Sequence, residues 1–123
     1  MIVAAMTSLA VWWAIPGSPI ARQRALFAAP RSSRRPNPAV LAAVEGAAAG
    51  AGFSLTLACD MIVAAEDAKF ILSYAKLGLS PDGGASWQLL RALPRQAVQQ
   101  MVWLAEPVSA RQLQGWGIVN AVT

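Results

Sequence analysis

The chain has 123 residues, which is enough for one domain and too few for two. Hydrophobic residues make up 56% of it and charged residues 13%, so it is more apolar than an ordinary free-standing domain. The formal net charge is +4, and the chain has no histidine and one cysteine, Cys59. This composition excludes histidine-dependent catalytic triads and an internal disulfide, so we expect no metal site, a Cys59 that packs as a small hydrophobe, and a cytoplasmic location.

The charge divides the chain into two unlike regions. Residues 1–44 contain five arginines and no acidic residue, whereas acidic residues outnumber basic ones from Glu45 onward. We place the boundary within Arg31–Pro38. The sequence therefore predicts a leader of residues 1–36, which resembles no domain, followed by a domain of residues 37–123.

The leader has little in common with a folded segment. Met1–Ile15 is apolar but shorter than the about 20 residues that span a bilayer, and Arg31–Pro36 has the composition of a basic linker. We expect the leader to be disordered or to be sequence translated out of frame. A signal-like segment and a membrane-anchored or basic interaction protein remain open as alternatives. A nucleic-acid partner would need a larger basic patch with interleaved aromatic residues, so we expect neither nucleic acid nor a membrane as partner.

Residues 37–123 alternate between strand and helix patterns, which predicts an α/β architecture. In chain order, the predicted elements are a strand at Ala39–Val44, a helix at Gly50–Cys59, strands at Met61–Ala65 and Lys69–Leu72, helices at Ala85–Ala92 and Arg95–Ala105, a short helix capped by Ser109, and a strand at Ile118–Val122.

Two glycine-rich turns carry the chemical signal. Glu45–Gly52 consists mainly of small residues and opens a helix, so its backbone N–H groups are free to face a developing negative charge. Gly78–Gly84 holds one acid, Asp82, just ahead of another helix. An anion-stabilising turn together with a carboxylate base indicates chemistry on an enolate.

Four segments then resemble the enoyl-CoA hydratase/isomerase, or crotonase, superfamily. They are PAVLAAVEGAAAGAGFSLTLACD at Pro38–Asp60, AAEDAKF at Ala64–Phe70, LGLSPDGG at Leu77–Gly84 and VSARQLQGWGIVN at Val108–Asn120. The set is specific, although each motif alone is weak, and it covers the central part of a family member. The resemblance implies a partial crotonase-like (ClpP/crotonase) ββα-type fold that is truncated at both ends.

The resemblance also implies a substrate and a site. Family members bind an acyl-CoA thioester and stabilise its enolate with two backbone N–H groups, one of which maps to Ala51. Coenzyme A is then part of the substrate, no cofactor is permanently bound, and the family assembles as trimers or hexamers. The substrate-binding positions carried over are Gly50, Gly52, Ser54, Tyr74 and Gly83.

Two departures decide which reaction we expect. The two glutamates that activate water in family hydratases map to Ser54 and Tyr74, and neither side chain replaces a carboxylate near neutral pH. The Ser-Pro-Asp-Gly-Gly turn is similar to that of isomerases of phenylacetyl-CoA-type degradation, which makes Asp82 the expected general base. We therefore favour double-bond or ring isomerisation over hydration. The alternatives are an Asp82 that only caps the next helix and a truncated remnant without activity.

Overall fold

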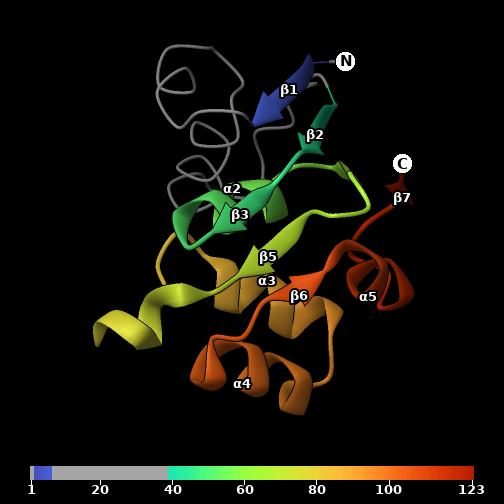
Figure 1. Cartoon of the computed structure of the whole chain (residues 1–123). Coiled ribbons are helices and arrows are strands. Elements are labelled where there is room, and N and C mark those ends of the chain that lie inside the picture. The colour runs from blue at the N-terminus through green and yellow to red at the C-terminus, as the bar shows by residue number, and fades with distance from the viewer. Residues whose placement is uncertain (1, 7–38) are drawn as a thin grey trace, which may run out of the picture.

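The computed structural model describes residues 2–6 and 39–123 (Figure 1). The strands are β1 (Ile2–Met6), β2 (Val40–Val44), β3 (Ala47–Ala49), β4 (Met61–Ala64), β5 (Lys69–Ile71), β6 (Val108–Ser109) and β7 (Ala121–Val122). The helices are α2 (Ala51–Leu57), the 3-10 helix η2 (Ser73–Leu77), α3 (Ala85–Ala92), α4 (Arg95–Leu104) and α5 (Ala110–Gly115). The α/β class predicted from the sequence is confirmed.

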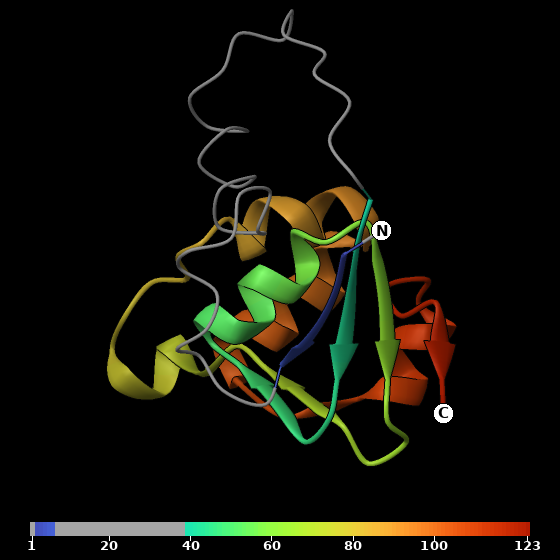
Figure 2. The ribbon, with the colours of Figure 1, turned by 90° about the horizontal axis from the view of Figure 1, so that it is seen from above.

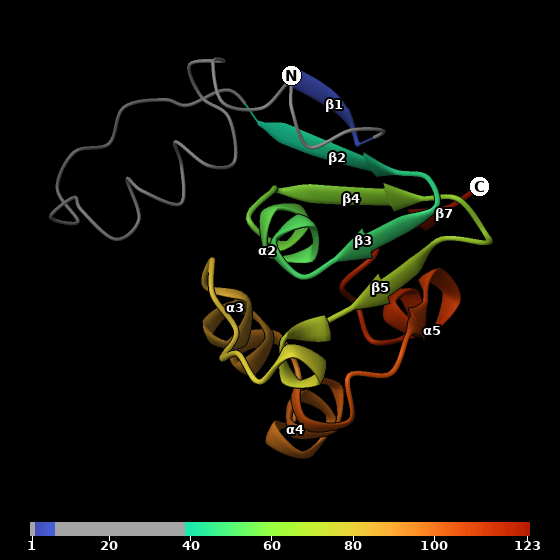
Figure 3. The ribbon, with the colours of Figure 1, turned by 60° about the vertical axis from the view of Figure 1, so that its left-hand side comes forward.

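The strands form two sheets. The larger has the order β1-β2-β4-β7 with all neighbours parallel, and the smaller has the order β3-β5-β6, in which β5 and β6 are antiparallel. Figure 2 shows β1, β2, β4 and β7 running in one direction. In Figure 3, α2 and the smaller sheet lie between these strands and helices α3 and α4. Parallel strands need crossovers, and β3 and α2 provide the one between β2 and β4.

Strand β1 lies in the segment that the sequence assigns to the leader. Its five residues pair in parallel register with β2, from Ile2 opposite Val40 to Met6 opposite Val44. For residues 2–6 this differs from the expectation of a disordered leader, because a five-residue apolar run is long enough to pair beside a buried strand. The expectations of disorder or out-of-frame sequence for the rest of the leader, and the basic linker Arg31–Pro36, lie outside the described residues.

The core forms where the inner sides of the sheets and helices meet. Strand β2 alternates buried and half-buried residues, as expected for a central strand. Phe53 of α2 and Phe70 of β5 are fully buried, and their ring centroids are 5.2 Å apart. Leu89 of α3 and Leu113 of α5 are equally inaccessible. Since these residues come from four elements, packing of the core fixes where α2 and β5 sit relative to α3.

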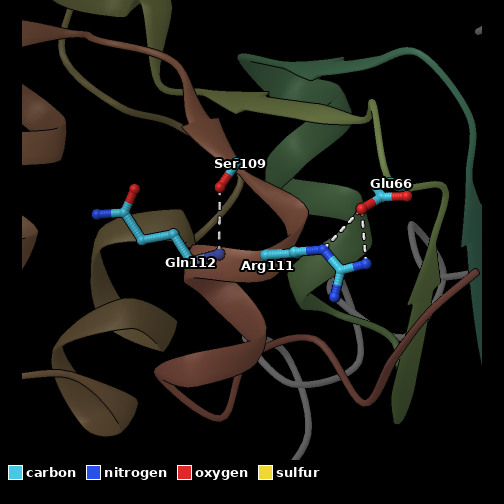
Figure 4. A network of polar contacts seen from close by, with 4 residues as sticks. All are labelled: Glu66, Ser109, Arg111 and Gln112. Carbon is cyan, nitrogen blue, oxygen red and sulfur yellow. Dashed lines mark hydrogen bonds and ion pairs between the residues drawn. The ribbon is translucent and has the colours of Figure 1, made fainter.

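Local signals explain the helix ends. In α4, Val98 and Met101 are buried, and the helix ends at Ala105, whose φ of 50° is left-handed. In α5, the Ser109 hydroxyl accepts a hydrogen bond from the Gln112 N–H at 3.2 Å, which confirms the predicted cap. Figure 4 shows this cap beside the pair of Arg111 and Glu66, whose closest atoms are 2.6 Å apart. The pair is exposed, so it adds little stability.

Two tryptophans lie on the surface, whereas a third tryptophan and the cysteine pack against the core. Trp116 is half-buried against the core, whereas Trp87 and Trp103 are 53% and 69% exposed, so these two lie outside the core of this chain. Cys59 is half-buried against the core, as expected, and its thiol donates to the Leu55 carbonyl at 3.5 Å. Among the residues that the structure describes, no helix is long and apolar enough to cross a membrane.

Candidate active site

Three of the predicted site residues meet although they come from separate elements. Tyr74 of η2 is only 8% exposed, and its hydroxyl donates a hydrogen bond to Oδ1 of Asp82, in the loop before α3. The Ser54 hydroxyl on α2 lies 3.1 Å from the Asp82 carbonyl oxygen and 3.3 Å from the Gly50 carbonyl oxygen, so its proton is shared between these acceptors. Both hydroxyls therefore attach the Asp82 loop to the interior.

The chain turns sharply at Gly50, just before α2. Gly50 has φ 52° and ψ −119°, and its N–H donates to the Ile71 carbonyl of β5 at 2.8 Å. A Cβ at this position would lie 3.8 Å from Cζ and 3.9 Å from the hydroxyl oxygen of Tyr74. The phenol thus lies close to the turn at Gly50, within contact distance of a side chain placed there.

The first turn of α2 provides the N–H groups that the sequence analysis assigns to an oxyanion site. Amides in the first turn of a helix lack acceptors within that helix, and no side chain of residues 39–123 caps α2. Ala51 is exposed and its φ is not positive, so an alanine fits this position without strain. Gly52, the next residue of α2, is buried. Ala51 therefore lies exposed in the first turn of α2, and its role as an oxyanion donor stays a prediction.

The loop before α3 presents the Asp82 side chain to solvent. Gly83 and Gly84 follow with φ of 62° and 79°, a left-handed conformation that glycine adopts at low cost. Gly84 is the N-cap of α3, and no side-chain hydrogen bond caps this helix within the described part of the chain. The alternative in which Asp82 only caps α3 is therefore wrong, because its carboxylate accepts from Tyr74 instead.

Burial and hydrogen bonding keep Tyr74 protonated. Burial raises the pKa of Tyr74 above its ordinary value of 10.0, and the hydrogen bond to the Asp82 carboxylate raises it further. The nearby Ser54 hydroxyl acts in the opposite direction. At neutral pH the phenol is consequently a hydrogen-bond donor, which suits the acceptor atoms of a carboxylate.

Three other charged residues, Lys69, Lys76 and Asp60, are exposed or have structural contacts. Lys69 and Lys76 are exposed. Asp60 fixes the start of β2, since its Oδ2 accepts from the Val40 N–H at 2.8 Å and its own N–H donates to the Val40 carbonyl at 2.9 Å. Residues 2–6 and 39–123 hold no group of three or more residues that could bind a metal ion.

The sequence predicts a substrate-binding role for Tyr74 and a catalytic role for Asp82, but no contact between them. The helix η2, which presents Tyr74, is not predicted either. The left-handed Gly78 that ends η2, with φ 67°, is the one local signal for this short helix. A hydrogen bond between residues eight positions apart, on a 3-10 helix and a loop, leaves no periodic trace in a sequence.

Comparisons with known proteins agree with the resemblance. A sequence model of the family described as enoyl-CoA hydratase/isomerase matches residues 26–123. The match starts ahead of residue 37, where the sequence analysis begins the domain. The carnitinyl-CoA dehydratase of Salmonella typhi is 49% identical over 83 residues, which are 68% of this chain and 32% of that protein. The chain thus spans about a third of the length of the curated relatives it matches.

Solved structures give the same result. An enoyl-CoA hydratase from Polaromonas sp. JS666 is 56% identical with a TM-score of 0.68, over 69% of this chain and 33% of that one. A protein from Thermobifida fusca YX, solved in complex with acetoacetyl-CoA, is 28% identical with a TM-score of 0.65, over 68% of this chain and 32% of that one. With most of its described residues in this shared fold, the chain belongs to the enoyl-CoA hydratase/isomerase, or crotonase, superfamily.

Proposed function

We propose that this chain forms part of an acyl-CoA site that isomerises a double bond or ring through an enolate. The observation that carries the proposal is the contact between the Tyr74 hydroxyl and the Asp82 carboxylate, next to the first turn of α2. This contact supports the proposal because Tyr74, which holds the Asp82 carboxylate, also lies close to Gly50, the residue just before α2. The complex of a similar protein with acetoacetyl-CoA supports a thioester as the substrate.

In this reaction Asp82 moves a proton between two carbons. Its carboxylate removes a proton from carbon, the electron pair moves through the conjugated system onto the thioester oxygen, and the Ala51 N–H stabilises the resulting negative charge. Return of the proton to another carbon shifts the double bond and restores the carboxylate. The second N–H donor of the family has no counterpart assigned in this chain.

The residues at the hydratase positions favour isomerisation over hydration. Hydration needs a water held and activated by paired carboxylates, but Ser54 and Tyr74 occupy those positions and both hydroxyls contact Asp82. The relatives carry dehydratase and hydratase names, which identify the chemistry of those proteins. We propose further that coenzyme A enters only as part of the substrate, that no cofactor is permanently bound, and that the chain works in the cytoplasm as a trimer or hexamer.

Exchange of substrate protons tests the proposal. The chain is incubated in D₂O with a 3-enoyl-CoA, and deuterium incorporation and conversion to the 2-enoyl isomer are followed by mass spectrometry and absorbance. We expect both to fall by a factor of at least ~100 in Asp82→Asn. Asp67→Asn, the same change in the exposed β4–β5 turn, is the matched control and should leave both rates unchanged.

The same assay separates the competing functions. Addition of water to a 2-enoyl-CoA at a rate above that of isomerisation would reject the proposed reaction in favour of hydration. Absence of exchange, isomerisation and hydration in a chain that melts cooperatively would support the catalytically inactive alternative.

A further inference from the structure

We infer that Tyr74 and Ser54 are positioning residues that hold the Asp82 carboxylate with Oδ1 occupied, which leaves Oδ2 as the oxygen that accepts the substrate proton. The inference rests on the proposed function, since it assigns the atom through which Asp82 acts. The two hydroxyls hold the residue at two points: Tyr74 at the side chain and Ser54 at the main-chain carbonyl. We call this arrangement of Tyr74, Ser54 and Asp82 the Asp82 clamp.

Asp82 needs such a clamp because its other hydrogen bond within the described residues restrains the main chain alone: its carbonyl oxygen also accepts from the Ala85 N–H at 3.3 Å. Its side chain is exposed, and an aspartate in water samples several rotamers. The two residues after it are glycines in left-handed conformations, so the main chain of the loop has freedom on that side. A base that reorients between turnovers loses the advantage of fixed geometry, which is worth orders of magnitude in rate.

The two residues that hold Asp82 are themselves buried, so the fold restrains their side chains. Ser54 on α2 is 1% exposed, and Tyr74 is buried and lies close to the turn at Gly50. Both hydroxyls are therefore held by parts of the fold that do not depend on the loop. The Tyr74 hydroxyl donates to Oδ1 of Asp82 without adding a second negative charge. A carboxylate at position 74 would instead repel the Asp82 carboxylate.

Tyr74 gives a direct optical test because it is the only tyrosine in the chain. Ionisation of its phenol is followed by ultraviolet absorbance against pH, while circular dichroism checks that the fold persists. The contact with Asp82 raises the pKa of Tyr74, so Asp82→Asn should move the titration midpoint to lower pH. Asp67→Asn should leave the midpoint where it is. An unchanged midpoint in Asp82→Asn would overturn the inference, whatever the activity.

Kinetics test what the clamp does. In the proton-exchange assay, Tyr74→Phe should lower kcat about tenfold and Ser54→Ala by less, both with KM nearly unchanged, because the substrate still binds while the base is misplaced. Ser86→Ala, which removes a half-buried hydroxyl on α3, is the control for loss of a hydroxyl. A rise in KM at constant kcat in Tyr74→Phe would mean a substrate-binding role and overturn the inference.

The two measurements separate this inference from the proposed function. A shifted midpoint without any exchange in the unaltered chain supports the clamp as a contact and rejects the isomerase chemistry. Exchange that depends on Asp82 but is indifferent to Tyr74→Phe supports the chemistry and rejects the clamp.

Discussion

Tyr74 holds its proton more tightly in the folded chain than in the unfolded one, and stability should depend on pH as a result. Burial and Asp82 raise the pKa of the folded phenol above 10.0, the value of an unfolded tyrosine. The stabilisation is fully present below pH 10 and is lost as pH rises from 10 through the folded pKa, because the unfolded chain releases its proton first. We expect the melting temperature to fall steeply in this range.

Comparison with Tyr74→Phe isolates this effect from the titration of lysines. The phenylalanine variant loses one hydrogen bond, worth about 1 kcal/mol at neutral pH, but has no phenol to ionise. Its melting curve against pH, measured by circular dichroism, should therefore be flatter above pH 10. Parallel curves for the two chains would show that Tyr74 ionises equally easily in both states.

At the scale of elements, the turn into α2 depends on Gly50. Its φ of 52° with ψ of −119° belongs to a region that only glycine adopts readily, although the space for a Cβ holds no contact shorter than 3.5 Å. Gly50→Ala should thus destabilise the fold by about 1–3 kcal/mol through backbone strain. Denaturant unfolding measures this loss, and the clamp should weaken with it because Tyr74 packs on the same turn.

Gly115 provides the matched control. It lies in α5 without a positive φ, and a Cβ there would meet nothing within 4 Å. Gly115→Ala should leave stability unchanged or raise it by up to about 1 kcal/mol, since alanine favours a helix. Equal losses in both variants would mean that general effects of the substitution, and not the conformation at Gly50, set the result.

The elements also show how far the sequence predicts this fold. The bounds of α3 are predicted as observed, because Gly83 and Gly84 mark its start and Pro94 follows its end. The helix predicted at Gly50–Cys59 is shorter, at Ala51–Leu57. Strands β3 and β6 were missed, because runs of three and two residues are too short to show alternation and arise from pairing with β5.

The candidate site, like the fold, is predicted from the sequence only in part. The sequence predicts its members, Ser54, Tyr74 and Asp82, because each lies in or next to a family motif. It does not predict that their side chains meet, since that depends on how α2, η2 and the Gly78–Gly84 loop pack in three dimensions. The catalytic and binding roles assigned to them remain predictions, and the assays above test them.

At the scale of the whole molecule, helices α3 and α4 expose large apolar side chains. Trp87 and Leu90 on α3 and Trp103 and Leu104 on α4 are each more than half exposed. Trp87 is partly screened by the Arg91 guanidinium, which lies 4.7 Å from its ring centroid, but Trp103 is 69% exposed. Apolar surface of this kind promotes association, so we expect the isolated chain to aggregate as its concentration rises.

Replacement of one tryptophan should reduce this association without loss of stability. Trp103→Gln removes exposed apolar area and no core contact, so light scattering at a given concentration should fall while the melting temperature stays within about 2 °C of the original. The same substitution at Trp116, which packs against the core, should lower the melting temperature because buried apolar contacts are lost. If scattering depends on Trp116 but not on Trp103, association proceeds through unfolded chains, and the exposed helices are not its cause.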